Sequence, residues 1–219
     1  MLSRAQAKRY YERHAKKQDA QAFYEDPPLE RLIAHARFGA AEHVFELGCG
    51  TGRLAEQLLS RSLSAQATYL GYDLSETMVT LARARLASFE MRARVLVTDG
   101  SLPWSLAAGS IDRVVISYVL DLLPDAEITA VLAEAARVLK PGGLLCLVNL
   151  TGGTTPLSRL NMWRWRLLYR VNPWWVGGCR PLAVGPRLES HTWTLQRHET
   201  VVAAAVPSEV VVAKRTSTT

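Results

Sequence analysis

The sequence predicts an α/β protein with a doubly wound, mostly parallel sheet of about seven strands and helices on both faces. Three observations carry this prediction. Short apolar runs alternate with helical patterns from residue 43 to residue 150. A glycine-rich turn at 48–52 follows the first apolar run and opens a helix. Two strand-like runs near the end of the chain have no helix between them, which favours an antiparallel hairpin at the end of the sheet.

The first 38 residues are expected to form a helical cap. The first 25 of them are polar, and a second helix is predicted over 26–39. Asp26 is placed to cap this helix and Gly39 to end it, with Pro27 or Pro28 in the first turn. Its apolar stripe consists of Leu29, Leu32, Ile33 and Ala36.

The segment 40–150 contains five strand candidates, at 43–47, 68–72, 93–97, 112–120 and 144–150. Amphipathic helical patterns follow the first, second and fourth of them. Such alternation is typical of parallel strands joined by helices, which bind ligands beyond the carboxyl ends of the strands.

The rest of the chain divides into an insertion and two closing strands. The insertion covers 151–188, and the closing segment is 189–219, with strand-like runs at 192–202 and 209–215 separated by Pro207 and Ser208. A chain of 219 residues is long enough for one substantial core. We therefore expect a single domain over 1–219, with the cap, the sheet segment, the insertion and the closing strands as its parts.

Positive charge is concentrated in the insertion. The whole chain has a net charge of +6. The segment 151–188 has no lysine and no acid, and its arginines are Arg159, Arg164, Arg166, Arg170, Arg180 and Arg187. A net positive charge can simply keep a protein soluble, but the concentration of arginines in one segment indicates a specific anionic neighbour.

Other features of the composition limit the classes of protein to which the chain can belong. The three cysteines, Cys49, Cys146 and Cys179, are far apart and indicate neither a disulfide framework nor a zinc site. No apolar run reaches the roughly 18 residues that a membrane span needs. The first residues contain no apolar segment typical of a secretory signal. The expected compartment is the reducing cytoplasm, with membrane association left open.

The glycine-rich turn is the first candidate site. Gly48, Gly50 and Gly52 alternate in "FELGCGTG", where they permit a tight turn and a close approach of the backbone to a ligand. Asp73 ends the second strand candidate about 20 residues later, where a carboxylate can accept both ribose hydroxyls. Nicotinamide-dependent oxidoreductases more often have a G-x-G-x-x-G spacing, and they are the competing class.

Five ordered motifs resemble those of class I S-adenosylmethionine-dependent methyltransferases. They are "FELGCGTG", "YDLSETM", "VTDGSLPW", "DRVVISYVLDLLPD" and "ARVLKPGGLLCLVNL". The resemblance covers roughly residues 40–150 and is closest to the small-molecule branch that includes quinone and lipid methyltransferases. It implies a Rossmann-like sheet, S-adenosylmethionine as cofactor, and in-line methyl transfer without a metal.

The resemblance also implies roles for individual residues. Glu46 would orient the glycine turn or the cofactor's amino group, and Asp73 would bind the ribose hydroxyls. The remaining cofactor-binding candidates are Gly48, Cys49, Gly50 and Gly52 at the methionine part and ribose, Leu74 and Met78 against the adenine, Asp99 and Gly100 at the adenine edge, and Ser117 beside the sulfonium. A nucleophilic Cys49 is disfavoured, because only backbone contact is needed there.

Tyr118 and Asp121 are the catalytic candidates. A base is needed only when the acceptor's proton must leave in the transition state. Tyr118 can touch the acceptor or simply pack, and Asp121 can act as a base or as a local cap or salt-bridge partner. Similar enzymes fold an N-terminal helix over the cofactor, which makes Tyr10, Tyr11 and His14 weaker candidates.

The insertion contains a helix over 157–171, followed by Pro173, Trp174 and Trp175. Arg159, Arg166 and Arg170 form one stripe between apolar surfaces. The helix is either a lid over the acceptor or an interfacial helix on anionic lipid, and both roles can coexist. Arg180 is a candidate for holding an anionic group. We expect a small, lipophilic acceptor, lipid- or quinone-like. Nucleic acid is disfavoured, an RNA or protein acceptor and a non-catalytic cofactor-binding protein are the alternatives, and the oligomeric state is not indicated.

Overall fold

The computed structural model describes residues 1–188 and 192–216. Within them, seven strands form one sheet in the order β3-β2-β1-β4-β5-β7-β6. The strands are β1 (His43–Leu47), β2 (Thr68–Asp73), β3 (Ala93–Val97), β4 (Ile111–Ser117), β5 (Leu139–Leu150), β6 (Trp193–Ala203) and β7 (Val206–Arg215). Strands β1 to β5 pair in parallel, and β7 lies antiparallel between β5 and β6. The predicted mostly parallel sheet with an antiparallel C-terminal hairpin is confirmed.

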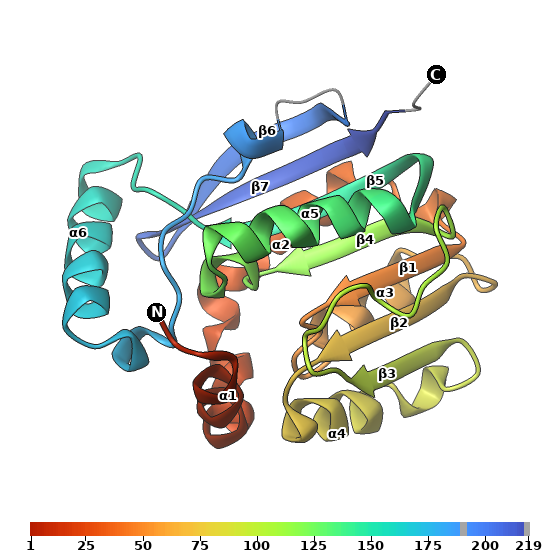
Figure 1. Cartoon of the computed structure of the whole chain (residues 1–219), viewed down its shortest axis with the longest axis horizontal. Helices are drawn as coiled ribbons and strands as arrows, with labels where there is room; N and C mark the ends of the chain where they lie inside the picture. The colour runs from red at the N-terminus through yellow and green to blue at the C-terminus, as the bar shows by residue number, and fades with distance from the viewer. Residues whose placement is uncertain (189–191, 217–219) are drawn as a thin grey trace.

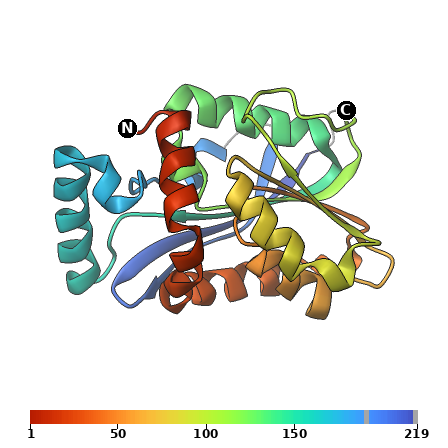
Figure 2. The same cartoon turned by 90° about the horizontal axis from the view of Figure 1, so that it is seen from below.

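Helices cover both faces of this sheet, as predicted. They are α1 (Arg4–Gln18), α2 (Ala22–His35), α3 (Arg53–Arg61), α4 (Glu76–Arg85), α5 (Asp125–Val138) and α6 (Pro156–Val171). Short 3-10 helices lie at η1 (Asp19–Gln21), η2 (Phe38–Ala40), η3 (Ala87–Phe89), η4 (Leu120–Leu122), η5 (Pro173–Val176) and η6 (Gly185–Leu188). In Figures 1 and 2, α5 lies on one face, α2 and α3 lie on the other, and α1 and α6 stand beyond the carboxyl ends of the parallel strands.

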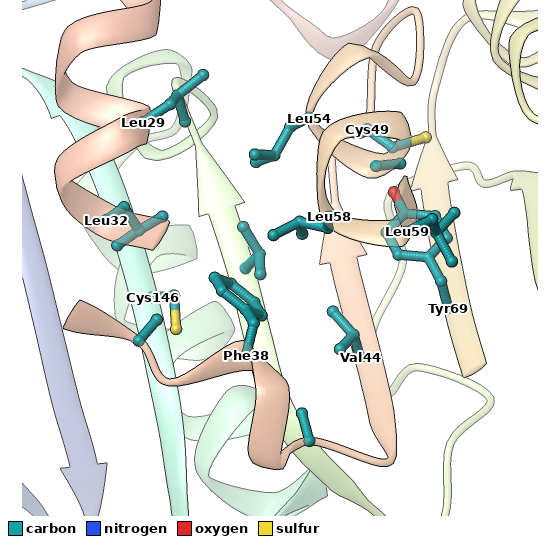
Figure 3. Close-up of a cluster of buried hydrophobic side chains, with 14 of the residues drawn as sticks. Leu29, Leu32, Phe38, Val44, Cys49, Leu54, Leu58, Leu59, Tyr69 and Cys146 are labelled. Atoms are coloured by element: carbon teal, nitrogen blue, oxygen red, sulfur yellow. The ribbon is translucent and has the colours of Figure 1, made fainter. Parts of the chain in front are cut away.

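Two buried clusters hold the layers together. On one face, leucines of α2 and α3 such as Leu32 and Leu58 pack with Phe38 and Val44, as Figure 3 shows. On the other face, α5 contributes Ile128 to a second cluster. Each fully buried side chain of this size contributes about 1.5–3 kcal/mol. Strand β5 is central and is buried on both faces over 144–150, which explains its continuous apolar run.

The second helix differs from the prediction at both ends. It begins at Ala22, so Asp26 lies inside it and pairs with Arg53 instead of capping it. Both prolines are therefore also inside the helix. At the other end Arg37, rather than Gly39, takes the left-handed conformation with φ of 48°. The prediction placed the prolines in the first turn and the glycine at the end of the helix, where these residues occur most often. In the structure, the ion pair with Arg53 of α3 holds the turn that precedes the prolines in helical form.

Three strand boundaries also differ. Strand β4 ends at Ser117, because Tyr118 has φ of 53° and leaves the strand. The segment 140–143 does not precede β5 but lies within it, at a shift in register against β4. The hairpin turn is formed by Ala204 and Ala205, with φ of 47° and 62°, and the predicted turn residues 207–208 belong to β7. A type I′ hairpin turn needs positive φ at both central positions, which Pro207 cannot supply.

The insertion follows the prediction closely. The expected helix over 157–171 is α6, which begins one residue earlier, with Thr155 and Ser158 forming a capping box. Pro173 opens η5 directly after it. The predicted closing segment 189–219 is seen in β6 and β7, while 189–191 and 217–219 lie outside the described residues.

Candidate cofactor and acceptor site

The glycine turn connects β1 to α3 and requires left-handed backbone. Gly48, Gly50 and Gly52 have φ of 75°, 52° and 76°. A Cβ atom on Gly48 would lie 2.2 Å from Cγ2 of Val119, so the turn packs too closely for any side chain there. A Cβ atom on Gly50 would meet nothing within 4 Å, which shows that Gly50 borders open space. The turn therefore leaves room for a ligand against its backbone.

Asp73 lies opposite this turn, at the carboxyl end of β2. Its Oδ2 accepts a hydrogen bond from the Gly50 backbone N–H at 2.9 Å, and its Oδ1 accepts one from the Ser75 N–H at 2.8 Å. Burial raises the pKa of this carboxyl group above its ordinary value. An ionised carboxylate can accept about four hydrogen bonds. With these two hydrogen bonds in place, the Asp73 carboxylate keeps acceptor capacity for hydroxyl donors such as those of a ribose.

Glu46 and Cys49 flank the turn from inside the core. Glu46 is 1% exposed and accepts a hydrogen bond from the Tyr69 hydroxyl at 2.6 Å. Burial raises the pKa of Glu46 to about 7. Burial also raises the pKa of the Cys49 thiol well above its ordinary value, and Figure 3 shows this side chain close to Tyr69. Cys49 is thus a protonated thiol in the core, which argues against a nucleophilic role.

One cavity of about 620 Å³ joins these groups to the end of β4. A volume of this size is typical of small-molecule and cofactor sites. Most of the residues predicted from the sequence line it: Glu46, Gly48, Cys49, Gly50, Asp73, Leu74, Met78, Gly100, Ser117, Tyr118 and Asp121.

Gly52 and Asp99 are not among the lining residues. Gly52 caps α3, and a Cβ atom on it would lie 3.1 Å from Cα of Ala82, so this position packs closely against α4. Asp99 is exposed, and its Oδ1 accepts a hydrogen bond from the Ser101 N–H at 2.8 Å. The carboxylate of Asp99 thus holds its own loop in place, and its contact with an adenine amino group stays a prediction.

The half of the cavity beyond β4 and β5, here named the acceptor half, contains both catalytic candidates. The Tyr118 hydroxyl lies 2.8 Å from the Ser208 hydroxyl on β7. Asp121 is fully buried in η4, and its Oδ2 accepts a hydrogen bond from the Leu150 N–H at 2.9 Å. Its Oδ1 has no hydrogen-bond partner among the residues that the structure describes. Burial raises the pKa of Asp121 to about 7.

The sequence missed several residues of the acceptor half. Tyr24 and Glu25 of α2 line it, as do Trp165 of α6 and Cys179. The only signal of Tyr24 and Glu25 was an aromatic residue beside an acid near the start of a helix, which is too common to single out. Trp165 and Cys179 lie in the insertion that the sequence predicted as a lid over the acceptor, although neither was named as a site residue. Of the N-terminal candidates, Tyr10 and Tyr11 line the cavity. His14 does not, and stacks on Tyr10 with ring centroids 4.3 Å apart.

Arg180 is engaged elsewhere. Its guanidinium donates to Oδ1 of Asp125 at 2.7 Å and to the Leu123 carbonyl at 2.9 Å, and it does not line the cavity. The prediction that it holds an anionic group is therefore not supported by its geometry. Over the described ranges, no group of three or more His, Cys, Asp or Glu side chains is arranged to hold a metal ion.

The central part of the chain is similar to known methyltransferases. Residues 44–143 match the family described as a methyltransferase domain. The tRNA N(3)-methylcytidine methyltransferase Mettl2 of Drosophila melanogaster is 33% identical over 126 residues, which cover 56% of this chain and 39% of that protein. The demethylmenaquinone methyltransferase of Lactococcus lactis subsp. lactis is 32% identical over 116 residues, covering 53% of this chain and 45% of that protein. The chain thus spans less than half the length of these relatives.

Solved structures share the whole fold. The [4+2]-cyclase SpnF has a TM-score of 0.72 at 16% identity, covering 99% of this chain and 97% of that one. The N-methyltransferase NodS from Bradyrhizobium japonicum WM9, solved with S-adenosyl-l-homocysteine, has a TM-score of 0.70 at 17% identity, covering 96% and 99%. At these identities the likeness establishes the fold alone. The matched family shows that residues 44–143 form a methyltransferase domain, and the open glycine turn with the buried Asp73 is a site that suits S-adenosylmethionine as its cofactor.

Proposed function

We propose that this chain transfers a methyl group to a small, lipophilic acceptor, a lipid- or quinone-like molecule. One observation carries the proposal: a single cavity joins the glycine turn and Asp73 to an acceptor half rich in aromatic side chains. Such a lining suits an apolar molecule with few polar groups. The name of the demethylmenaquinone methyltransferase supports a quinone-like acceptor.

The residues of the glycine-turn half would hold the cofactor. S-adenosylmethionine supplies a methyl group already activated on a sulfonium, so the leaving group needs no acid. In this proposal Asp73 accepts hydrogen bonds from the ribose hydroxyls, and Gly48 and Gly50 let the backbone approach the methionine part. The other predicted lining residues complete the site: Glu46, Cys49, Leu74, Met78, Gly100 and Ser117.

The acceptor half would align the acceptor for in-line attack. Alignment alone can lower a barrier by several kcal/mol, about 7–11 in the best cases. Tyr118 is fixed by its contact with Ser208 and borders the acceptor. Asp121 is the candidate base, because its Oδ1 lacks a partner within the described chain and its pKa of about 7 suits proton transfer near neutral pH.

We further propose that α6 contacts an anionic membrane surface and gives lipophilic acceptors access to the cavity. Leu157, Trp163 and Val171 are 65%, 62% and 64% exposed on one face of this helix. The exposed Arg159, Arg166 and Arg170 lie beside that face. An apolar face flanked by arginines is typical of interfacial helices. No helix in the described part of the chain has the length and apolar character for crossing a bilayer.

Incubation with radiolabelled S-adenosylmethionine and separate cell extracts tests the acceptor class. The proposal predicts label in a lipid extract after solvent partition. The name of the Mettl2 relative and the arginines of α6 favour RNA as the second candidate, and label in purified RNA would replace the lipophilic acceptor with it. Label in neither extract, with the cofactor bound, would contradict the proposed transfer and favour a non-catalytic cofactor-binding protein.

A further inference from the structure

The acceptor half combines aromatic side chains with carboxylates. Its aromatic lining includes Tyr10 and Tyr11 on α1, Tyr24 on α2, Tyr118 after β4, and Trp165 on α6. Glu25 and Asp121 supply the acids. Aromatic faces and a carboxylate are the groups that proteins use together to bind an ammonium ion.

Oδ1 of Asp121 has no hydrogen-bond donor among the residues that the structure describes. The whole side chain is 0% exposed, and the Leu150 N–H satisfies only Oδ2. A buried carboxylate oxygen without a donor costs free energy on the order of 1–3 kcal/mol or more. Asp121 is one of the residues that line the cavity, so a ligand there that brings its own donor would satisfy this oxygen.

The cations that line the cavity are already neutralised. Arg4 pairs with Glu127 at 3.0 Å, and Lys8 pairs with Glu76 at 2.9 Å. Arg53 pairs with Glu25 at 2.9 Å. Consequently no cation of the lining, within the residues that the structure describes, is left to attract an anionic head group. Arg180, outside the lining, is the cation whose charge acts on Asp121.

We propose that the acceptor is an amphiphilic amine, whose ammonium group donates to Oδ1 of Asp121 and whose apolar part lies among the aromatic side chains of the acceptor half. This inference rests on the proposed function and specifies its substrate class. Asp121 also accepts one proton from the bound ammonium, which leaves a neutral nitrogen with its lone pair. Burial raises the pKa of Asp121 to about 7 and makes the carboxylate a suitable base for that step.

A water molecule is the competing partner for Asp121. The Nε atom of Arg180 also lacks a partner in the described chain, and the backbone of Arg180 donates to the Asp121 carbonyl at 3.2 Å. A water that bridges the two side chains would satisfy both. In that case the affinity for an amine would not depend on the charge of Asp121.

A head-group series on one skeleton tests the proposal. 2-Phenylethylamine, 2-phenylethanol and phenylacetate are titrated into the protein saturated with S-adenosylhomocysteine, with tryptophan fluorescence and calorimetry as readouts. Because a charge-assisted hydrogen bond is stronger than a neutral one, we expect the amine to bind at least about tenfold more tightly than the other two. Equal or tighter binding of the alcohol or the carboxylate would overturn the proposal.

Asp121→Asn provides the second arm. The amide oxygen of asparagine can still accept from the Leu150 N–H, so the charge is removed and the backbone contact kept. We expect the variant to lose about tenfold or more in amine affinity, with unchanged binding of the alcohol and of S-adenosylhomocysteine. Glu90→Gln, which removes an exposed charge outside the cavity lining, should leave amine affinity unchanged.

Unchanged amine affinity in Asp121→Asn would overturn the proposal in favour of the bridging water. The binding of S-adenosylhomocysteine separates this result from a failure of the proposed function. A wild-type protein that binds no S-adenosylhomocysteine contradicts the proposed function. A protein that binds it but shows no preference for the amine contradicts only the substrate class.

Discussion

Burial of a carboxyl group makes the stability of this protein depend on pH. Asp121 has a pKa of about 7 in the fold, against about 3.9 in an unfolded chain. The folded state holds a proton that the unfolded state has lost, so this contribution to stability is complete below the unfolded pKa and is lost as pH rises through about 7. We expect the free energy of unfolding of Asp121→Asn to rise relative to wild type by a few kcal/mol between about pH 5 and pH 8, because a shift of one pKa unit corresponds to about 1.4 kcal/mol.

Urea denaturation of the cofactor-free protein at several pH values measures this gain. Asp112→Asn is the matched control, because hydrogen bonds from Lys140 and from the backbone hold the pKa of Asp112 below its ordinary value. Asp112 is ionised in both the folded and the unfolded state above about pH 5. The difference in free energy of unfolding between Asp112→Asn and wild type should therefore stay constant with pH in that range. A constant difference in free energy of unfolding between Asp121→Asn and wild type over this pH range would contradict the raised pKa of Asp121.

Cys49 is expected to be chemically inert. The side chain is 6% exposed, and burial raises its thiol pKa well above the ordinary value. We therefore expect Cys49→Ala to keep S-adenosylhomocysteine affinity within about threefold of wild type, because a buried thiol contributes packing rather than thiolate chemistry. Calorimetry checks this. Loss of cofactor binding in a folded variant would show that the sulfur itself is needed.

The sequence predicted those site residues whose positions follow from backbone geometry. Gly48 and Gly50 were identified because a turn between a strand and a helix needs positive φ, and Asp73 because it ends the neighbouring strand. Asp99 was assigned by resemblance alone, and its side chain hydrogen-bonds within its own loop. Glu25 was missed because its place in the cavity depends on how α2 packs, which no local pattern encodes.

At the scale of elements, α6 has an exposed apolar face. Its inward side holds Met162, which is 2% exposed, while Trp163 is 62% exposed. We expect wild type to sediment with liposomes that contain anionic lipid, and Trp163→Ala to reduce the bound fraction severalfold, since tryptophan anchors interfacial helices. Met91→Ala is the control, because Met91 is 94% exposed next to the start of β3, at the opposite end of the strands.

The liposome measurement has a clear negative outcome. If wild type stays in the supernatant at low salt, where attraction between arginine and anionic lipid is strongest, the membrane contact is wrong. Equal losses in Trp163→Ala and Met91→Ala would show that binding is not directed by α6.

The turn between β6 and β7 is strained by its sequence. Ala204 and Ala205 both have positive φ, which costs a non-glycine residue about 1–2 kcal/mol. We expect Ala205→Gly to raise the free energy of unfolding by about 1 kcal/mol, measured by urea denaturation. Ala203→Gly, within β6, should lower it by about 0.5–1 kcal/mol instead. The same sign for both variants would contradict the left-handed turn.

At the scale of the whole molecule, the sheet could be predicted and its exact connections could not. Alternating apolar runs and helices are sufficient for a parallel sheet, and all five parallel strands were found. The antiparallel hairpin was expected, but its turn was placed at 207–208 because proline and serine favour turns. The position of β7 between β5 and β6 depends on pairing between distant strands, as between Cys146 and Val212, which local patterns do not specify.

Calorimetric titration of the wild type with S-adenosylhomocysteine tests most directly whether the cavity binds the cofactor against Asp73. We predict binding that weakens at least about tenfold in Asp73→Ala, since two hydroxyls lose a charged acceptor. Glu90→Ala is the control, because this carboxylate is exposed and outside the cavity lining, and the affinity of the variant should stay close to that of wild type. No binding by wild type, or an unchanged affinity in Asp73→Ala, would contradict the proposed cofactor site.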